Sequence, residues 1–115
     1  MAAERLVADR LVAAGWAVVA RNWRGARGEL DVVVVRDGRL RFVEVKARAA
    51  QDEGGIEAVG AWKQRRLVRA ARAFLASWPE PVAEACFTVV VVTLPPRGSS
   101  LEHARVEWID DAFDA

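Results

Sequence analysis

The sequence predicts an α/β domain in which a mixed β-sheet is flanked by helices, and three observations support this fold class. Apolar residues recur at helical spacing in two segments, two β-branched runs are joined by an Asp-Gly pair, and a third run is almost continuously apolar. An Asp-Gly pair between strands is a strong hairpin signal, and a continuous apolar run is typical of a strand buried on both faces. The expected order is α-β-β-β-α-β-β: helix 2–14, strands 16–21, 29–35 and 40–46, helix 56–78, strands 87–93 and 104–109.

Each helix has an apolar stripe and a recognisable end. In the first, Val7, Ala8 and Leu11 lie on one face, and Gly15 stands where a helix commonly ends. The second is terminated by Pro79. Its expected packed stripe is Leu67, Val68, Ala71, Phe74 and Leu75.

The connections are polar or rich in glycine and proline. Residues 22–28 read as a basic loop after the first strand, residues 47–55 as a second loop and residues 95–100 as an exposed loop. The last strand, 104–109, is expected at a sheet edge, and an unpaired edge would allow a homodimer.

Length and composition limit the possibilities. The 115 residues suit one domain spanning 1–115, and 53% hydrophobic with 29% charged residues is the balance of a globular protein. Cys86 is the sole cysteine, which excludes an intramolecular disulfide and a cysteine-rich zinc site. No apolar run approaches the length of a membrane span and the N-terminus does not resemble a signal peptide, so we expect a cytoplasmic protein.

The net charge of +1 hides an uneven distribution. Residues 1–75 carry a net charge of +6 and residues 76–115 carry −5. The first two-thirds of the chain could therefore favour a polyanion, although a local excess of this size is also common on other enzymes.

The predicted hairpin brings four ionisable side chains together. With Asp37 and Gly38 at the turn, Asp31 opposes Glu44, and Glu29 opposes Lys46. Side chains alternate along a strand, so these four project from one face. Directly opposed like charges are destabilising, and the apolar neighbours of this hairpin would increase the cost of an uncompensated pair.

A divalent cation held by oxygen ligands would remove this repulsion. Magnesium is usually held by one or two carboxylates together with water and substrate phosphates. Asp31 and Glu44 are thus candidate ligands of Mg²⁺ or Mn²⁺, and Lys46 could orient a water or stabilise developing charge. The alternative is a salt-bridged cluster without a metal, in which Lys46 and nearby arginines neutralise the acids.

Three helical residues could support this centre. Glu4 lies on the apolar stripe of the first helix and could reach the same metal, or it could simply favour the helix N-terminus. Lys63 and Gln64 project toward the apolar flank of the second helix, where they could touch a phosphate or a metal-bound water, or snorkel to solvent.

Several cations could contact nucleic acid, and one aromatic residue could stack on a base. Trp23 is equally well explained as a core residue, and the arginine ridge of the second helix (Arg65, Arg66, Arg69, Arg72) as a solvated face. The candidates for nucleic-acid binding are Arg21, Trp23, Arg24, Arg27 and Arg48.

The stretch Gly28-Glu29-Leu30-Asp31, followed by Phe42-Val43-Glu44-Val45-Lys46-Ala47-Arg48, resembles the YraN-like proteins, a bacterial family. The resemblance covers roughly residues 2–93. Further residues in the family's order are Ala3-Glu4, Gly15, Asn22-Trp23-Arg24, Glu57-Ala58-Val59, Lys63, Ala70-Ala71 and Leu75.

That family is similar to the restriction-endonuclease-like superfamily, which includes the archaeal Holliday junction resolvases. The resemblance implies a three-layer restriction-endonuclease-like fold and a metal-dependent nuclease acting on DNA, with branched DNA as one option. It also implies that Glu4, Asp31, Glu44 and the Val45 carbonyl surround the metal. Lys46 would assist the water, and Lys63 or Gln64 would be the polar helix residue.

The sequence departs from the family at one strand. Members usually have Arg-Phe-Asp-Val where this chain has Cys86-Phe87-Thr88-Val89. If the aspartate matters for activity, this chain would be weak or inactive. The alternative function is therefore a non-catalytic module that binds nucleic acid or a protein partner and retains the nuclease fold.

Overall fold

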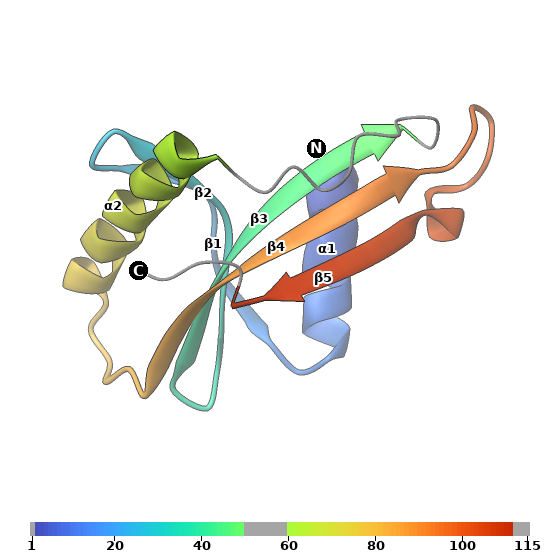
Figure 1. Ribbon diagram of the computed structural model, residues 1–115. Coiled ribbons are helices and arrows are strands. Elements are labelled where there is room, and N and C mark those ends of the chain that lie inside the picture. Colours follow the sequence, from blue (N-terminus) through green and yellow to red (C-terminus); the bar gives the residue numbers. More distant parts are fainter. Residues whose placement is uncertain (1, 50–59, 112–115) are drawn as a thin grey trace.

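The computed structural model describes residues 2–49 and 60–111, in which five strands form one sheet and two α-helices cover it (Figure 1). The elements are α1 (Ala2–Ala13), β1 (Ala17–Gly25), β2 (Gly28–Arg36), β3 (Arg39–Ala49), α2 (Ala61–Ser77), β4 (Glu84–Leu94), the short 3₁₀ helix η1 (Leu101–His103) and β5 (Arg105–Asp110).

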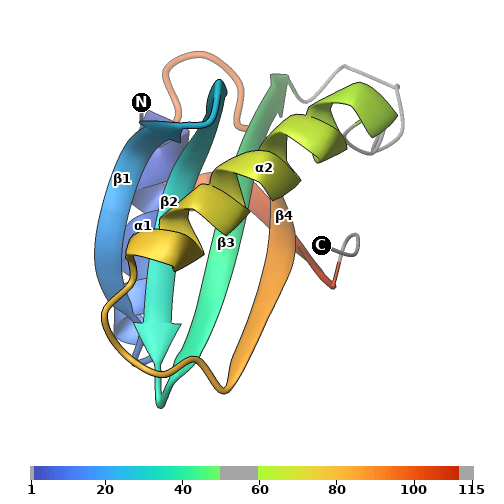
Figure 2. The same ribbon diagram turned by 90° about the vertical axis from the view of Figure 1, so that its left-hand side faces the viewer.

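The helices lie on opposite faces of the sheet. Figure 2 shows α2 crossing in front of the strands and α1 behind them. The predicted α/β fold class, with a three-layer arrangement consistent with the restriction-endonuclease-like fold, is confirmed. Within the described ranges, no helix is long and apolar enough to cross a membrane.

The sheet is mixed, with strand order β1-β2-β3-β4-β5. β3 and β4 are parallel and paired along their whole length, and the other neighbours are antiparallel. A parallel pair needs a crossover connection, which α2 supplies. The predicted Asp37-Gly38 turn is present, with both residues at positive φ, and it sets the predicted register of Val33 opposite Phe42. β5 lies at a sheet edge, as predicted.

Several element boundaries differ from the prediction. The expected loop at 22–28 is wrong, because β1 continues to Gly25 and turns through Ala26 and Arg27, both at positive φ. Residues 47–49 belong to β3 rather than to a loop, because β4 pairs with them. The rest of the expected loop, residues 56–59 of the expected helix and the Glu57-Ala58-Val59 motif lie outside the described residues.

The two faces of the sheet bury separate cores. On the α1 side, valines of β2, β3 and β4 pack against α1 residues such as Val7 and Leu11. On the α2 side, the core is more aromatic, with Phe42 edge-on to Phe74 at a centroid distance of 5.9 Å. The predicted helix residues Leu67, Ala71 and Phe74 are buried there.

The sheet divides at Asp31. The pairing of β2 with β3 runs from the turn only as far as Val32 opposite Val43. Beyond that point β2 stays paired with β1 and β3 stays paired with β4. The side-chain alternation of β2 also changes here, because Leu30 and Val33 both pack on the α2 side. Regular alternation along the strand would place Leu30 on the face of Val32, and the structure shows that this expectation is wrong.

The same strand end receives α2 at close range. A Cβ added to Gly28 would lie 2.6 Å from the Arg66 carbonyl oxygen and 3.0 Å from the Ala70 Cβ. Since real Cβ atoms do not approach backbone this closely, only glycine permits this helix-to-strand distance at position 28.

We expect Gly28→Ala to push α2 away from β2 and to destabilise the protein by about 1–3 kcal/mol, as overpacking commonly does. Thermal unfolding monitored by circular dichroism measures this loss. Gly60→Ala is the matched control, because a Cβ at Gly60 meets nothing within 4 Å. Equal melting temperatures for the two variants would contradict the close-packing interpretation.

Candidate functional site

Two carboxylates meet where β2 and β3 separate. Asp31 comes from β2 and Glu44 from β3, and both border a groove of about 310 Å³ beneath the first turns of α2. The groove is lined by Glu29, Asp31, Glu44, Trp62, Lys63, Arg66 and Leu67.

The Asp31 side chain binds the backbone of β3, the strand with which β2 is no longer paired at this point. The Val45 N–H donates to its Oδ2 over 2.9 Å, which replaces the ladder bond that a continued β2–β3 pairing would have made. In a strand, the N–H and C=O of one residue point to the same side. The Val45 carbonyl is therefore directed toward the gap between β2 and β3, as a backbone ligand would need to be.

Glu44 is a buried acid that forms an ion pair with a lysine of α2. Only 8% of the residue is exposed, and the Lys63 Nζ lies 2.5 Å from its Oε1. Burial raises the pKa of Glu44 to about 7, the Lys63 contact opposes this rise, and the charge of Asp31 and a hydrogen bond with it add to the rise. The two carboxylates are therefore close enough to disfavour simultaneous ionisation.

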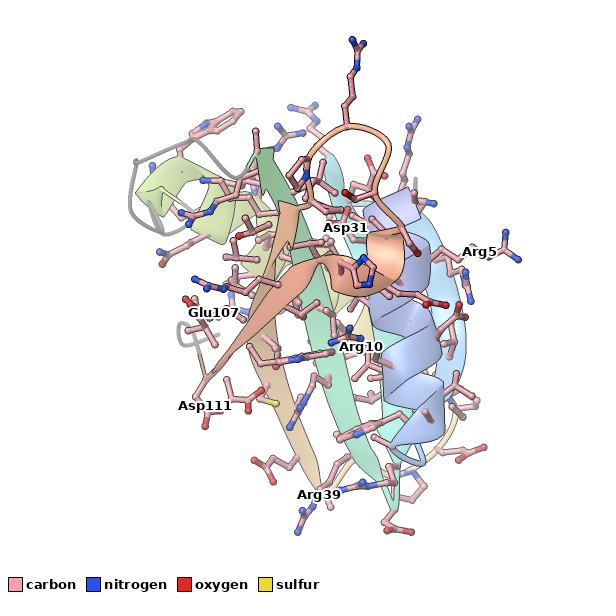
Figure 3. The ribbon with its side chains drawn as sticks, turned by 90° about the vertical axis from the view of Figure 1, so that its right-hand side faces the viewer. Arg5, Arg10, Asp31, Arg39, Glu107 and Asp111 are labelled. Carbon is pink, nitrogen blue, oxygen red and sulfur yellow. The ribbon has the colours of Figure 1, made fainter. Side chains whose placement is uncertain are left out.

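Glu4 approaches the same region from α1. A second groove of about 450 Å³ runs between the N-terminal end of α1 and β1, and it is lined by Glu4, Arg5, Arg21, Asn22 and Asp31, with Ala2 and Val32. Figure 3 shows Asp31 near that end of α1. Burial, and then the negative charges of Asp31 and Glu29, raise the pKa of Glu4. Asp31 thus borders both grooves.

The other predicted members of the centre are less enclosed. Lys46 is exposed and does not line either groove, although alternation on β3 places it on the face of Glu44. Glu29 lines the smaller groove but pairs with Arg24 (Nε to Oε2, 3.8 Å) rather than with Lys46. Gln64 is half-buried on α2, beside Lys63.

The candidate nucleic-acid residues occupy different environments. Arg21 lines the larger groove, Arg24 lies exposed beside Glu29, and the Arg27 carbonyl accepts from Arg66. Trp23 is half-buried, and its ring meets that of Phe74 edge-on at a centroid distance of 5.4 Å. This placement agrees with the interpretation of Trp23 as a core residue. The Nε of Arg48 donates to the Thr93 Oγ1 over 3.1 Å.

The donors present fit a hard divalent cation. Asp31 and Glu44 supply carboxylate oxygens, and the Val45 carbonyl supplies a third oxygen directed toward the gap. Two carboxylates suffice for magnesium, which keeps several waters and takes further oxygens from a substrate phosphate. Within residues 2–49 and 60–111, however, no three Asp, Glu, His or Cys groups converge as a metal cluster, so Glu4 does not complete one.

The departure at Thr88 lies on the other face of the sheet. Thr88 is fully buried, and its Oγ1 donates to the Asp110 Oδ1 over 3.0 Å. The Asp110 Oδ1 also lies 3.2 Å from the Arg41 Nη1. Thr88 shares the face of Val90, which packs toward α1, whereas Glu44 faces Lys63 on α2. A carboxylate and a guanidinium therefore meet beside Thr88, supplied by β5 and β3.

Sequence reasoning missed two residues of the smaller groove. Trp62 and Arg66 line this groove but are not among the sequence-based candidates, since Arg66 belongs to the arginine ridge described above. Their spacing of four residues, which makes side chains neighbours on a helix, was the available signal. The Arg66 guanidinium lies over the Trp62 ring at 4.8 Å from its centroid.

Comparison with known proteins agrees with the sequence resemblance. The "Uncharacterised protein family UPF0102" matches residues 3–92. A UPF0102 protein of Gloeobacter violaceus (strain ATCC 29082 / PCC 7421) is 52% identical over 97% of this chain and 89% of its own length. UPF0102 proteins of Synechococcus sp. (strain JA-3-3Ab) and Paracidovorax citrulli (strain AAC00-1) are each 42% identical, over 98% and 100% of this chain and 88% and 82% of their own lengths.

Glu44 should make stability depend on pH. Its folded pKa of about 7 lies above the ordinary value of 4.5. In this interval the folded state binds more protons than the unfolded state, so stability is highest below the ordinary value and falls as the pH rises through the folded pKa. We expect Glu44→Gln to remove this loss and to raise stability at about pH 8 by roughly 1–3 kcal/mol.

Urea unfolding at a series of pH values measures the effect. Glu107→Gln, which removes an exposed carboxylate from β5, is the matched control and should leave the pH dependence unchanged. The assignment fails if Glu44→Gln shows the same slope as the unsubstituted protein.

Proposed function

The chain belongs to the UPF0102 family, the YraN-like proteins, and we propose that it is a Mg²⁺- or Mn²⁺-dependent nuclease that hydrolyses phosphodiester bonds of nucleic acid. The observation that carries this proposal is the meeting of Asp31 and Glu44 at the divergence of β2 and β3, with Lys46 two residues further along β3.

The carboxylate pair is unfavourable unless something binds it. A buried acid whose pKa is raised by burial and by a neighbouring carboxylate is a weak contributor to stability, yet the strands and the Val45 hydrogen bond hold Glu44 and Asp31 together. A carboxyl whose pKa is strongly raised and that lines a groove, as that of Glu44 does, is a common feature of catalytic sites. This supports a role in chemistry over a role in folding.

The residues of the chain would divide the work as follows. A divalent ion would supply Lewis-acid activation of the phosphodiester and of water. Asp31, Glu44 and the Val45 carbonyl would hold that ion. Lys46 would orient the attacking water and stabilise the charge that develops on the phosphorus oxygens.

Lys63 would act on the substrate. In this structure its ammonium neutralises Glu44. A cation held by Glu44 would take over this neutralisation, and the flexible lysine stem would then allow the ammonium to move to a substrate phosphate. Gln64 and Glu29, at the edges of the groove, would support the same contacts.

Nucleic acid is the polyanion that suits the surroundings. Arg5 and Arg21 line the larger groove and Lys63 and Arg66 line the smaller one, so cations lie on both sides of Asp31. Phosphate contacts of this kind position a backbone without reading its sequence. DNA in the cytoplasm is the proposed substrate, and a homodimer formed through an edge strand would suit a branched one.

A non-catalytic binding module is the second candidate, and one observation favours it. The Glu44–Lys63 ion pair compensates the acid without a metal. This resembles the salt-bridged cluster considered above, with Lys63 in the neutralising role.

Cleavage of labelled duplex, single-stranded, flapped, four-way-junction and RNA substrates separates these functions. We expect metal-dependent cutting that Asp31→Asn, Glu44→Gln and Lys46→Ala each reduce by about 100-fold or more, the size of effect usual for removing one charge-stabilising group. Arg39→Ala, which removes a cation from the far end of β3, is the control and should cut normally (Figure 3). Binding without cutting by any preparation would favour the module.

Metal binding can be tested without activity. We expect millimolar Mg²⁺ or Mn²⁺ to raise the melting temperature, with an increase that grows above about pH 7, because the ion competes with the proton on Glu44. A concentration one hundred times the Kd would stabilise by about 2.7 kcal/mol.

The Asp31→Asn variant is the control for this measurement, and it should melt at the same temperature with and without the ion. A metal-induced shift of equal size in that variant would place the ion elsewhere.

A further inference from the structure

Trp62 is the exposed tryptophan of this protein. All five tryptophans lie in the described ranges, and four of them are buried or half-buried. Trp16, Trp23, Trp78 and Trp108 pack against the two cores. Trp62, in the first turn of α2, is 62% exposed. An indole ring in water is the largest single apolar surface that a side chain can present, so its position is informative.

The Trp62 ring is supported from one side. The Arg66 guanidinium lies over it at 4.8 Å from the ring centroid. That guanidinium is itself anchored, because its Nε and Nη2 donate to the Arg27 carbonyl over 3.1 and 2.8 Å. A cation on one face fixes the ring, and with most of the residue exposed the other face is accessible to a flat ligand.

This ring stands at the mouth of the candidate active site. Trp62 lines the same groove as Asp31, Glu44 and Lys63. A nucleotide whose phosphate reached those carboxylates would therefore have its base within the neighbourhood of the indole. The exposed cations Arg65 and Arg69 continue along α2 beyond it.

We propose that Trp62 is a stacking platform for an unpaired nucleobase adjacent to the phosphodiester that is cleaved. The substrate class would then be nucleic acid with single-stranded or locally unpaired nucleotides, rather than continuous duplex. In a duplex, each base is covered by its neighbours, and only an unpaired or flipped base can lie flat on an aromatic ring. This inference rests on the proposed function, because it assumes that nucleic acid enters the groove.

Binding without cleavage tests the proposal. The full chain is titrated, with EDTA present, into a labelled single-stranded oligonucleotide, into a duplex with one unpaired segment, and into a continuous duplex, and fluorescence anisotropy is recorded. We expect Trp62→Ala to weaken binding to the first two on the order of tenfold and to leave duplex binding unchanged. Trp62→Phe should retain most of the affinity.

A base-deletion series identifies the contact. An abasic site is moved along the oligonucleotide one position at a time. One position should weaken binding to the unsubstituted protein, and the same position should have no further effect on Trp62→Ala, because both changes remove the same stacking pair. The salt dependence of binding should not change, because no phosphate contact is lost.

The control is Val12→Ala, which removes an exposed apolar side chain from α1, 52% exposed and absent from the lining of both grooves. It should bind all three substrates normally. Circular dichroism of Trp62→Ala separates a lost contact from a lost fold. Equal loss on all substrates, or no loss in a folded variant, would overturn the proposal.

The cleavage panel keeps the two proposals distinguishable. Metal-dependent cutting that Trp62→Ala does not alter on any unpaired substrate would overturn the stacking role and leave the nuclease standing. Trp62-dependent binding without cutting would support stacking and count against the nuclease. Absence of nucleic-acid binding by the unsubstituted protein would overturn both.

Discussion

The hydrogen bond from the Val45 N–H to the Asp31 carboxylate is the contact on which the candidate site depends. It lies where β2 leaves β3, and it replaces a backbone partner with a side chain. The Val45 N–H is buried and needs an acceptor. The Asp31 carboxylate supplies this acceptor where β2 no longer pairs with β3. Asp31 therefore has a structural role in addition to the chemical role that we propose for it. Through this bond the position of its carboxylate is fixed relative to β3.

The separation of the strands also explains how charged groups enter an apolar sheet. From Val32 and Val43 toward the Asp37 turn the two strands are continuously paired, and most of their apolar side chains are buried in the two cores. Above this point the strands open two grooves, one toward α1 and one toward α2, and Asp31 borders both. Water, and the polyanion that we propose as substrate, would reach the carboxylates here without crossing a core. Glu44 nevertheless stays buried, and this burial raises its pKa to about 7.

Much of this arrangement follows from the sequence, and the parts that do not have identifiable reasons. The Asp37-Gly38 turn fixes the register, so the meeting of Asp31 and Glu44 was predictable from the spacing alone. The reversal of alternation around Asp31 was not, because it occurs where Asp31 and the facing Asn22, which has φ of 48°, drop out of the pairing between β1 and β2. The secondary-structure propensities of the residues around Leu30 do not indicate that its side chain packs on the α2 side.

The departure from the family pattern at Thr88 shows a second limit of sequence reasoning. An acid missing from β4 suggested a damaged site, yet Thr88 faces α1 and contacts Asp110, which β5 supplies. Where the family usually has an arginine and an aspartate on β4, this chain has a guanidinium and a carboxylate on the neighbouring strands, from Arg41 and Asp110. Only the strand order reveals this, because β5 lies beyond the region of strongest family similarity. Since Glu44 faces the opposite helix, the substitution does not touch the carboxylate pair.

The docking of α2 positions both the candidate site and the proposed base contact. Gly28 lets the helix approach so closely that Arg66 reaches the Arg27 carbonyl. Residues four apart are neighbours on a helix, so this one contact fixes Arg66 beneath the Trp62 ring and sets Lys63, one residue further along, against Glu44. A small shift of the helix would therefore move both the ammonium beside the acid and the proposed platform for a base. The glycine that opens the Gly28-Glu29-Leu30-Asp31 motif and the aspartate that closes it thus serve one geometry: the first positions α2 over the groove, and the second opens the groove beneath it.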